Sequence, residues 1–187
     1  MTISLMIFAL IYMKSRDTYN VYILLSLVFV LASNIFLIKR ENRLCFLGGI
    51  ITSLLSVICY IIRIILWLPF KLEYYFYLIL VIFFIVWFLI FYRRIKPLLN
   101  ELSFFFTLYS YVLVCGVGLS VIVCLTNLTI YSLALLVGFL LLVFSDCIIF
   151  VLVYNKKVKR IALFTTAPSN FAQICLLIGC IFINRGI

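Results

Sequence analysis

Residues 128–154 read LTIYSLALLVGFLLLVFSDCIIFVLVY, and this stretch decides the fold class. At a rise of about 1.5 Å per residue, a helix of this length crosses a hydrocarbon core of about 30 Å. Its apolarity is continuous, whereas a barrel strand would alternate apolar and polar residues. Asp146 is the one charged residue within it. The stretch predicts a transmembrane helix that carries a single buried acid.

Apolar runs continue in both directions from this helix. The chain of 187 residues is 68% apolar and 11% charged, with a mean hydropathy of +1.40, which excludes a soluble globular protein. Backbone groups in lipid must be paired within their own segment, so each run is expected to be helical. We predict an all-α polytopic membrane protein with about seven transmembrane helices in a single domain, residues 1–187. The other six runs are Met1–Met13, Tyr19–Ile38, Leu44–Leu68, Tyr74–Tyr92, Leu102–Leu125 and Ile161–Ile183.

The first run, Met1–Met13, is short and apolar, as the apolar region of a signal peptide is. It has no basic region before it and no A-x-A cleavage site after it, so we interpret it as a short retained span. It is too short to cross a bilayer upright and is expected to lie tilted or to be the remnant of a longer helix.

The basic residues set the orientation of the spans. The net charge is +10, but the charges fall between apolar runs and no stacking motif accompanies them, so no nucleic-acid partner is predicted. Cytoplasmic loops carry the excess of Lys and Arg, which places the N-terminus inside and the C-terminus outside. A composition rich in Phe, Ile, Lys and Asn fits an AT-biased bacterial genome, so the expected location is a bacterial inner membrane. Ten basic residues lie on the predicted inner side, namely Lys39, Arg40, Arg43, Arg93, Arg94, Lys96, Lys156, Lys157, Lys159 and Arg160, and five on the other, namely Lys14, Arg16, Arg63, Lys71 and Arg185.

Arg63 is the basic residue that lies within an apolar run. Trp67, Pro69 and Lys71 follow it, so we expect its side chain to snorkel to the outer interface. A functional role is the alternative.

Cysteine usage favours neither a metal site nor a disulfide. The chain has seven cysteines, no histidine and no C-x-x-C motif. Cysteine in an apolar run behaves as a small hydrophobic residue, so no cofactor is predicted. Walker, G-x-S-x-G and H-E-x-x-H motifs are also lacking, which leaves those enzyme classes without support. The cysteines are Cys45, Cys59, Cys115, Cys124, Cys147, Cys175 and Cys180.

Asp146 is the best candidate for a functional residue. An ionisable group in hydrocarbon costs at least ~2.5 kcal/mol on insertion scales, which makes a functional site the default hypothesis. The alternative is a packing role in which Ser, Asn or Gln partners hold the acid. Distances from the basic clusters place Asp146, Asn34, Asn170 and Gln173 roughly 8 to 20 Å below the cytoplasmic surface. They are expected to form a polar pocket that opens inward.

Small residues and one proline mark expected helix contacts. Gly48, Thr52 and Ser56 recur at intervals of four, with Gly49 and Ser53 alongside, which is typical of a small-xxx-small packing face. Ala134, Gly138 and Ser145 share a face on the span that carries Asp146. Pro168 either kinks the last span or stands at its start after a longer loop.

The segment from Gly138 to Phe144-Ser145-Asp146, followed by Gln173 midway along the final helix, resembles the YhhN family of lysoplasmalogenase-like membrane proteins. An early family motif falls on Ser33-Asn34 and on Phe46, Gly49, Val57 and Tyr60. Asn34 stands where the family has Asp, and Val57 stands where it has His. The resemblance implies eight helices, of which this chain lacks the first.

The resemblance also implies an activity, hydrolysis of the vinyl ether bond of lysoplasmalogens to a fatty aldehyde and a glycerophospho head group. Asp146 and Asn34 then become the catalytic candidates, and Ser145, Gln173, Asn170 and Tyr60 the substrate-binding candidates. A carboxyl group that burial keeps protonated can act as the acid. Asn34 can orient water but cannot accept its proton. We therefore expect membrane lipids as partners, with either slow ether hydrolysis or a lipid pocket without chemistry.

Two further classes remain open from the sequence. One intramembrane carboxylate also suits a small proton-coupled transporter, although no internal repeat supports one. The other is an assembly subunit in which the acid pairs with a partner helix. The oligomeric state is not predicted.

Overall fold

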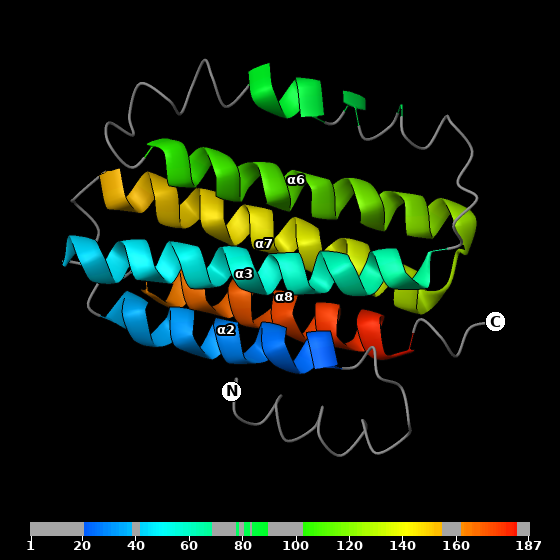
Figure 1. Ribbon diagram of the computed structural model, residues 1–187, viewed down its shortest axis with the longest axis horizontal. Helices are drawn as coiled ribbons and strands as arrows, with labels where there is room; N and C mark the ends of the chain where they lie inside the picture. Colours follow the sequence, from blue (N-terminus) through cyan, green and yellow to red (C-terminus); the bar gives the residue numbers. More distant parts are fainter. Residues whose placement is uncertain are drawn as a thin grey trace. The chain divides into compact units, whose positions relative to one another are not determined.

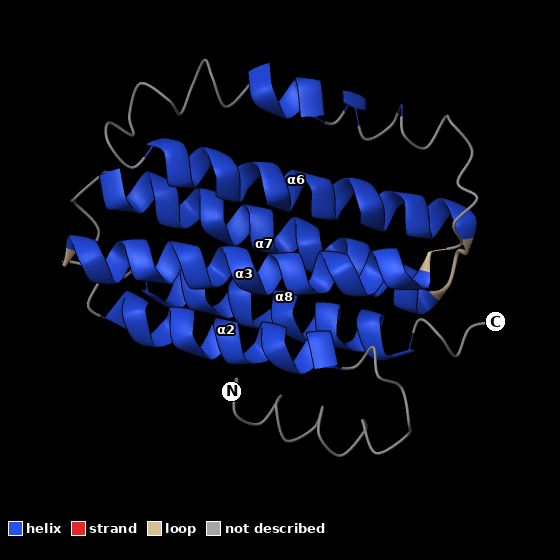
Figure 2. Cartoon of the chain, in the orientation of Figure 1, coloured by secondary structure: helices blue, strands red, loops and turns tan. Residues whose placement is uncertain are grey.

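Five labelled helices make up most of the described part of the protein. The computed structural model describes residues 21–38, 42–68, 78, 81–82, 84–89, 103–154 and 162–182, and none of these residues forms a strand (Figures 1 and 2). The predicted all-helical fold is confirmed over this part of the chain. The helices are α2 (Val21–Ile38), α3 (Arg43–Trp67), α6 (Ser103–Thr126), α7 (Ile130–Tyr154) and α8 (Ala162–Phe182).

Four helices are long and apolar enough to cross a membrane. They contain the stretches Val21–Ile38, Leu44–Trp67, Phe104–Thr126 and Ile130–Ile148, and α8 adds a shorter apolar stretch, Ala167–Phe182. The protein is therefore an integral membrane protein. The predicted run Met1–Met13 lies outside the described residues, and only residues 78, 81–82 and 84–89 of the run Tyr74–Tyr92 are described, as helix. Seven spans and the orientation stay predictions.

The chain divides into two compact units, residues 1–119 and 120–187. The first contains α2, α3 and most of α6, and the second contains the end of α6 together with α7 and α8. A single domain over residues 1–187 stays a prediction.

In the first unit, α2 packs along α3 (Figure 1). A Cβ atom on Gly49 would lie 2.8 Å from the Cδ2 atom of Leu37, and one on Gly48 would lie 3.3 Å from the ring of Phe36. The two glycines therefore let the helices approach more closely than any larger residue would. The predicted small-residue face of α3 is confirmed here as a packing face.

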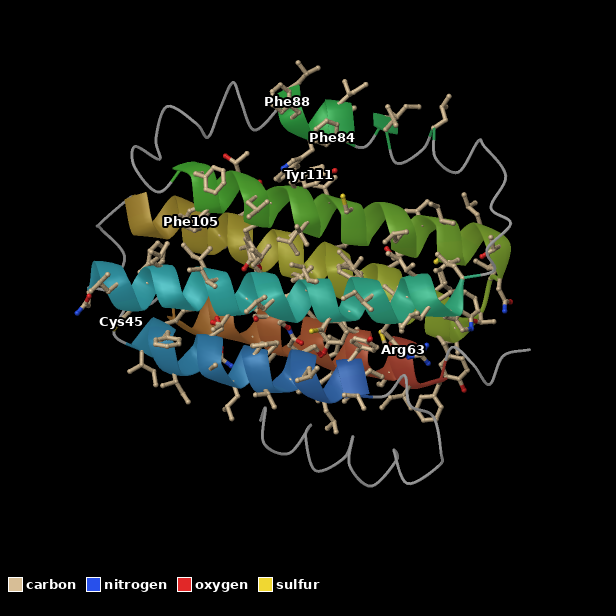
Figure 3. The ribbon with its side chains drawn as sticks, viewed as in Figure 1. Cys45, Arg63, Phe84, Phe88, Phe105 and Tyr111 are labelled. Carbon is tan, nitrogen blue, oxygen red and sulfur yellow. The ribbon has the colours of Figure 1, made fainter. Side chains whose placement is uncertain are left out.

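Ring contacts link the other described segments of the first unit. Phe46 on α3 lies 6.1 Å from Phe106 on α6, measured between ring centroids. Phe84 meets Tyr111 of α6 edge to face, with centroids 5.0 Å apart (Figure 3). These distances are typical of favourable aromatic pairs.

In the second unit, α7 packs along α8. A Cβ atom on Gly138 would lie 2.8 Å from the Cγ atom of Leu176, and one on Gly179 would lie 3.0 Å from the Cβ atom of Leu135. Tyr131 stacks on Phe182 with ring centroids 5.4 Å apart. Tyr131, near the start of α7, contacts the end of α8, and Gly138, later in α7, contacts an earlier residue of α8. The two helices are therefore antiparallel.

Side-chain caps define where two of the helices begin. The Asn42 side chain accepts a hydrogen bond of 3.0 Å from the backbone N–H of Leu44 at the start of α3. Before α7, the N–H of Ser132 donates to the Thr129 hydroxyl at 3.2 Å, and the N–H of Thr129 donates to the Ser132 hydroxyl at 2.9 Å. Such caps satisfy N–H groups that the helix itself leaves without partners.

Candidate functional site

Asp146 lies on the buried side of α7. Residues at alternating intervals of three and four before it are almost fully buried, and Asp146 itself is half-buried at the end of this row. Among the residues that the structure describes, it is the one acidic side chain. The spacing explains the placement, because such intervals keep residues on one helix face. The row consists of Ser132, Leu135, Phe139 and Leu142.

Ser145 lies at one edge of the same buried face of α7. It is 0% exposed and lies two turns beyond Gly138, where α7 contacts α8 most closely. Ser145 and Asp146 each have interaction partners. The Ser-Asp pair therefore spans the packed side of the helix, while the next residue, Cys147, is exposed.

Pro168 lies on the face of α8 that is turned toward α7. The structure places it inside the helix, which begins six residues earlier at Ala162. The interpretation of Pro168 as a helix start is therefore wrong, and Pro168 lies within the helix. The kink expected at this position stays a prediction. Counting eleven residues back from Gly179 on α8 reaches Pro168, and eleven residues forward from Leu135 on α7 reaches Asp146. Eleven residues make about three turns, so Asp146 and Pro168 lie level with each other on the facing sides of the pair.

The two remaining polar candidates on α8 differ in burial. Gln173 is 6% exposed and has an interaction partner. It lies on the flank of α8 that also buries Leu177 and Cys180. Asn170, one turn earlier, is half-buried. Both residues belong to the same unit as Asp146.

Tyr60 and Asn34 belong to the first unit. Tyr60 is 0% exposed, and Val57, one turn before it on α3, is 3% exposed. Asn34 is exposed because its neighbour Ser33 takes the inward position and donates a hydrogen bond of 3.0 Å to the carbonyl of Gly49. The convergence of Asn34 and Tyr60 with Asp146 in one pocket stays a prediction.

Arg63 is the residue that the sequence placed wrongly. It is 2% exposed, whereas a snorkelling side chain would reach the interface (Figure 3). The spacing of Arg63 from other residues of α3 could have indicated its burial. Ser56, Tyr60 and Arg63 follow one another at intervals of four and three, which places them on one helix face, and all three are buried. A buried arginine in a membrane helix is a candidate functional residue.

The described residues contain no set of side chains that could bind a metal ion. No group of three or more His, Cys, Asp or Glu side chains lies close enough there to hold an ion. All seven cysteines are free thiols, of which Cys59, Cys124 and Cys180 are buried. The site is therefore one carboxylate with hydroxyl and amide groups in its own unit.

A comparison with protein families decides the relationship. The model of the YhhN family matches residues 1–180. The chain belongs to the YhhN family. No curated protein and no solved structure gives a significant match to this YhhN chain. The matched region includes all five labelled helices except the last two residues of α8.

Proposed function

We propose that this YhhN protein hydrolyses the vinyl ether bond of lysoplasmalogens, with Asp146 as the proton donor. The observation that supports the proposal is the position of Asp146, the one acidic side chain among the described residues, on the packed face of an apolar helix. A carboxyl group that carries its proton can act as a general acid. The sequence resemblance supplies the class of substrate.

The reaction can be written with Asp146 as the acid and then as the base. The carboxyl group gives its proton to the vinyl carbon that is not bonded to oxygen, which leaves an oxocarbenium ion at the neighbouring carbon and a carboxylate at Asp146. Water adds to the cation and returns a proton to the carboxylate, giving a hemiacetal. The hemiacetal then collapses to a fatty aldehyde and the free hydroxyl of the glycerophospho head group. Proton transfer by a positioned side chain typically contributes ~10² to 10⁴ in rate.

Asn34 limits the rate that this scheme allows. The resemblance assigns a second carboxylate to position 34, where it would stabilise the cation or activate water. An amide can hold water by hydrogen bonds, but it has no full negative charge and accepts no proton. Asp146 must then perform both steps, and the proposed activity is slow.

The alternative is a lipid-binding protein without catalysis. Asn34 in place of Asp and Val57 in place of His favour it, because both replacements remove groups that could move protons. In this case Asp146 and Gln173 hold a lysolipid head group through hydrogen bonds, and no bond is cleaved.

Aldehyde release from two substrates tests the proposal. The purified protein, the Asp146→Asn variant and a Cys147→Ser control would each be incubated with a lysoplasmalogen and with the ester-linked lysolipid of the same chain length. We expect the parent and the control to release aldehyde from the vinyl ether alone, and the Asp146→Asn variant to release none. Binding of the lysolipid without aldehyde would support the lipid-binding alternative. A protein that neither binds nor cleaves the lipid would overturn both and favour a transporter or an assembly subunit.

A further inference from the structure

The helix pairs α2–α3 and α7–α8 bury the same pattern of positions. Each of the five residues that α2 buries has a buried counterpart on α7, 112 residues further along the chain. The exposed side agrees as well, since Val28 is exposed and so is its counterpart Leu140. The buried counterparts are Ile23 and Leu135, Ser26 and Gly138, Leu27 and Phe139, Val30 and Leu142, and Ser33 and Ser145.

The second helices of the two pairs correspond with a shift of 116 residues. Five buried residues of α3 have counterparts on α8 that are also buried. Both helices of each pair therefore turn equivalent sides toward the interior of their own unit. These counterparts are Ser56 and Ala172, Val57 and Gln173, Tyr60 and Leu176, Arg63 and Gly179, and Ile64 and Cys180.

The contacts between the helices fit the same correspondence. Ser33 meets Ser53 in the first pair, and Leu135 meets Gly179 in the second pair. The counterparts of Leu135 and Gly179 lie ten residues before Ser33 and ten residues after Ser53, so they face each other at the same level of the first pair. The register of the two helix pairs therefore agrees. We infer from the burial and the register that the two pairs form an internal structural repeat.

The repeat is hidden in the sequence because most counterparts differ in residue type. Tyr60 corresponds to Leu176, and Arg63 corresponds to Gly179. What recurs is the side of each helix that packs, and such a side tolerates many side chains. For this reason no internal repeat is apparent from the residues alone.

One sequence feature does recur, a serine that is followed by Asn or Asp. Ser33 is held inward by its hydrogen bonds to α3, and Asn34 is exposed. The counterpart Ser145 is 0% exposed, and Asp146 is half-buried. Neighbouring residues of a helix lie about 100° apart around its axis, so fixing the serine also fixes the direction of the residue that follows it.

We propose that Ser145 is a positioning residue for Asp146. Its side chain anchors α7 on α8 as Ser33 anchors α2 on α3, and this anchor presents Asp146 at the edge of the helix pair. Ser145 has an interaction partner, as a buried hydroxyl group in hydrocarbon requires. The inference rests on the proposed function, in which Asp146 is the acid, but it concerns the direction of this side chain and not its protonation.

Infrared spectroscopy of the Asp146 side chain tests this inference without relying on turnover. The band of Asp146 is identified as the carboxyl or carboxylate stretching band that the Asp146→Asn variant lacks. We expect Ser145→Ala to shift this band, because α7 loses its anchor and the Asp146 side chain enters different surroundings. Ser145→Cys is similar in size to the parent and keeps a weak S–H donor, so it should shift the band less.

The repeat supplies a matched control. Ser33→Ala removes the equivalent anchor from the helix pair that carries no acid. It should lower the free energy of unfolding about as much as Ser145→Ala does, but leave the Asp146 band in place. Cys147→Ser, a change at the exposed neighbour of Asp146, should also leave the band in place. Circular dichroism would confirm that each variant keeps its helices.

The outcomes distinguish this inference from the proposed function. Ser145→Ala should lower kcat for aldehyde release about three- to tenfold, the effect of one net hydrogen bond, with little change in KM. A band that Ser145→Ala leaves unmoved, or that Ser33→Ala moves equally, would overturn the inference even if the parent releases aldehyde. A band that moves in Ser145→Ala but in neither control supports it. If the parent then released no aldehyde, the proposed function alone would fail.

Discussion

The hydroxyl oxygens of Ser33 on α2 and Ser53 on α3 lie 2.6 Å apart, and Ser33 also donates to the carbonyl of Gly49 at 3.0 Å. Ser33 has one proton to give, so Ser53 is the donor of the first bond. The two bonds join α2 to α3 at the point where Gly48 and Gly49 allow close approach. They turn Ser33 inward and leave Asn34 exposed.

Replacing Ser33 with Ala should weaken the contact between α2 and α3. Interhelical hydrogen bonds in membranes contribute about 0.6 to 2 kcal/mol, and the variant loses both. We expect the free energy of unfolding, measured in mixed detergent micelles, to fall by about 1 kcal/mol. Asn34→Ala is the control and should stay within about 0.5 kcal/mol of the parent. Equal losses for the two variants would contradict the inward position of Ser33.

A methyl group at Gly138 should disturb the second unit. The added Cβ would lie 2.8 Å from Leu176 Cγ and 3.0 Å from its backbone nitrogen, so the helices must separate. Overpacking of this kind typically costs about 1 to 3 kcal/mol, and we expect Gly138→Ala to fall in that range. Gly48→Ala is the comparison, because its Cβ meets only the Phe36 ring at 3.3 Å. A smaller loss for Gly138→Ala than for Gly48→Ala would argue against the close contact of α7 with α8.

Arg63 should matter for stability because it is buried. Truncating a buried, interacting charged side chain commonly costs a few kcal/mol, whereas a residue at the interface costs little. We expect Arg63→Gln to lower the free energy of unfolding by about 2 kcal/mol or more. Arg43→Gln, a change at the first residue of α3, should have a much smaller effect. Similar effects of the two variants would favour a snorkelling Arg63.

The sequence predicted the five labelled helices to within about two residues at each end. Continuous apolar runs bounded by charged or polar residues give this result, since hydrocarbon requires helices. The inward turn of Ser33 could not be read in the same way. Ser33 and Asn34 are both polar neighbours on α2, and which of them faces α3 depends on where Gly49 and Ser53 lie on the other helix.

Arg63 shows a second limit of the sequence. Its closeness to Trp67 and Pro69 suggested an interfacial side chain, but its helix face is shared with Ser56 and Tyr60, which are buried. The helix face on which Arg63 lies therefore decides its burial more than its closeness to the membrane interface does, because helix packing determines which side of a helix meets lipid. The position of Pro168 level with Asp146 likewise depends on the helix register, which follows from contacts of Gly138 and Gly179 that the sequence alone does not specify.

Restoring a carboxylate at position 34 should raise the activity. Asn34→Asp would supply the second acid that the proposed mechanism lacks, and we expect aldehyde release to increase about ten- to a hundredfold, at the lower end of typical acid–base contributions. We expect Asn34→Ala to lower it slightly, because alanine cannot form the hydrogen bonds to water that an amide can. An Asn34→Asp variant with parental activity would show that position 34 takes no part in the reaction.

The most direct test of the central claim is the isotopic content of the aldehyde formed in D₂O. If Asp146 delivers a solvent-exchanged proton to the vinyl carbon, the parent should release aldehyde that carries one deuterium at the carbon next to the carbonyl group. The Asp146→Asn variant should release at least about a hundredfold less. Aldehyde without deuterium, or an undiminished rate in the Asp146→Asn variant, would contradict the role of Asp146 as the acid.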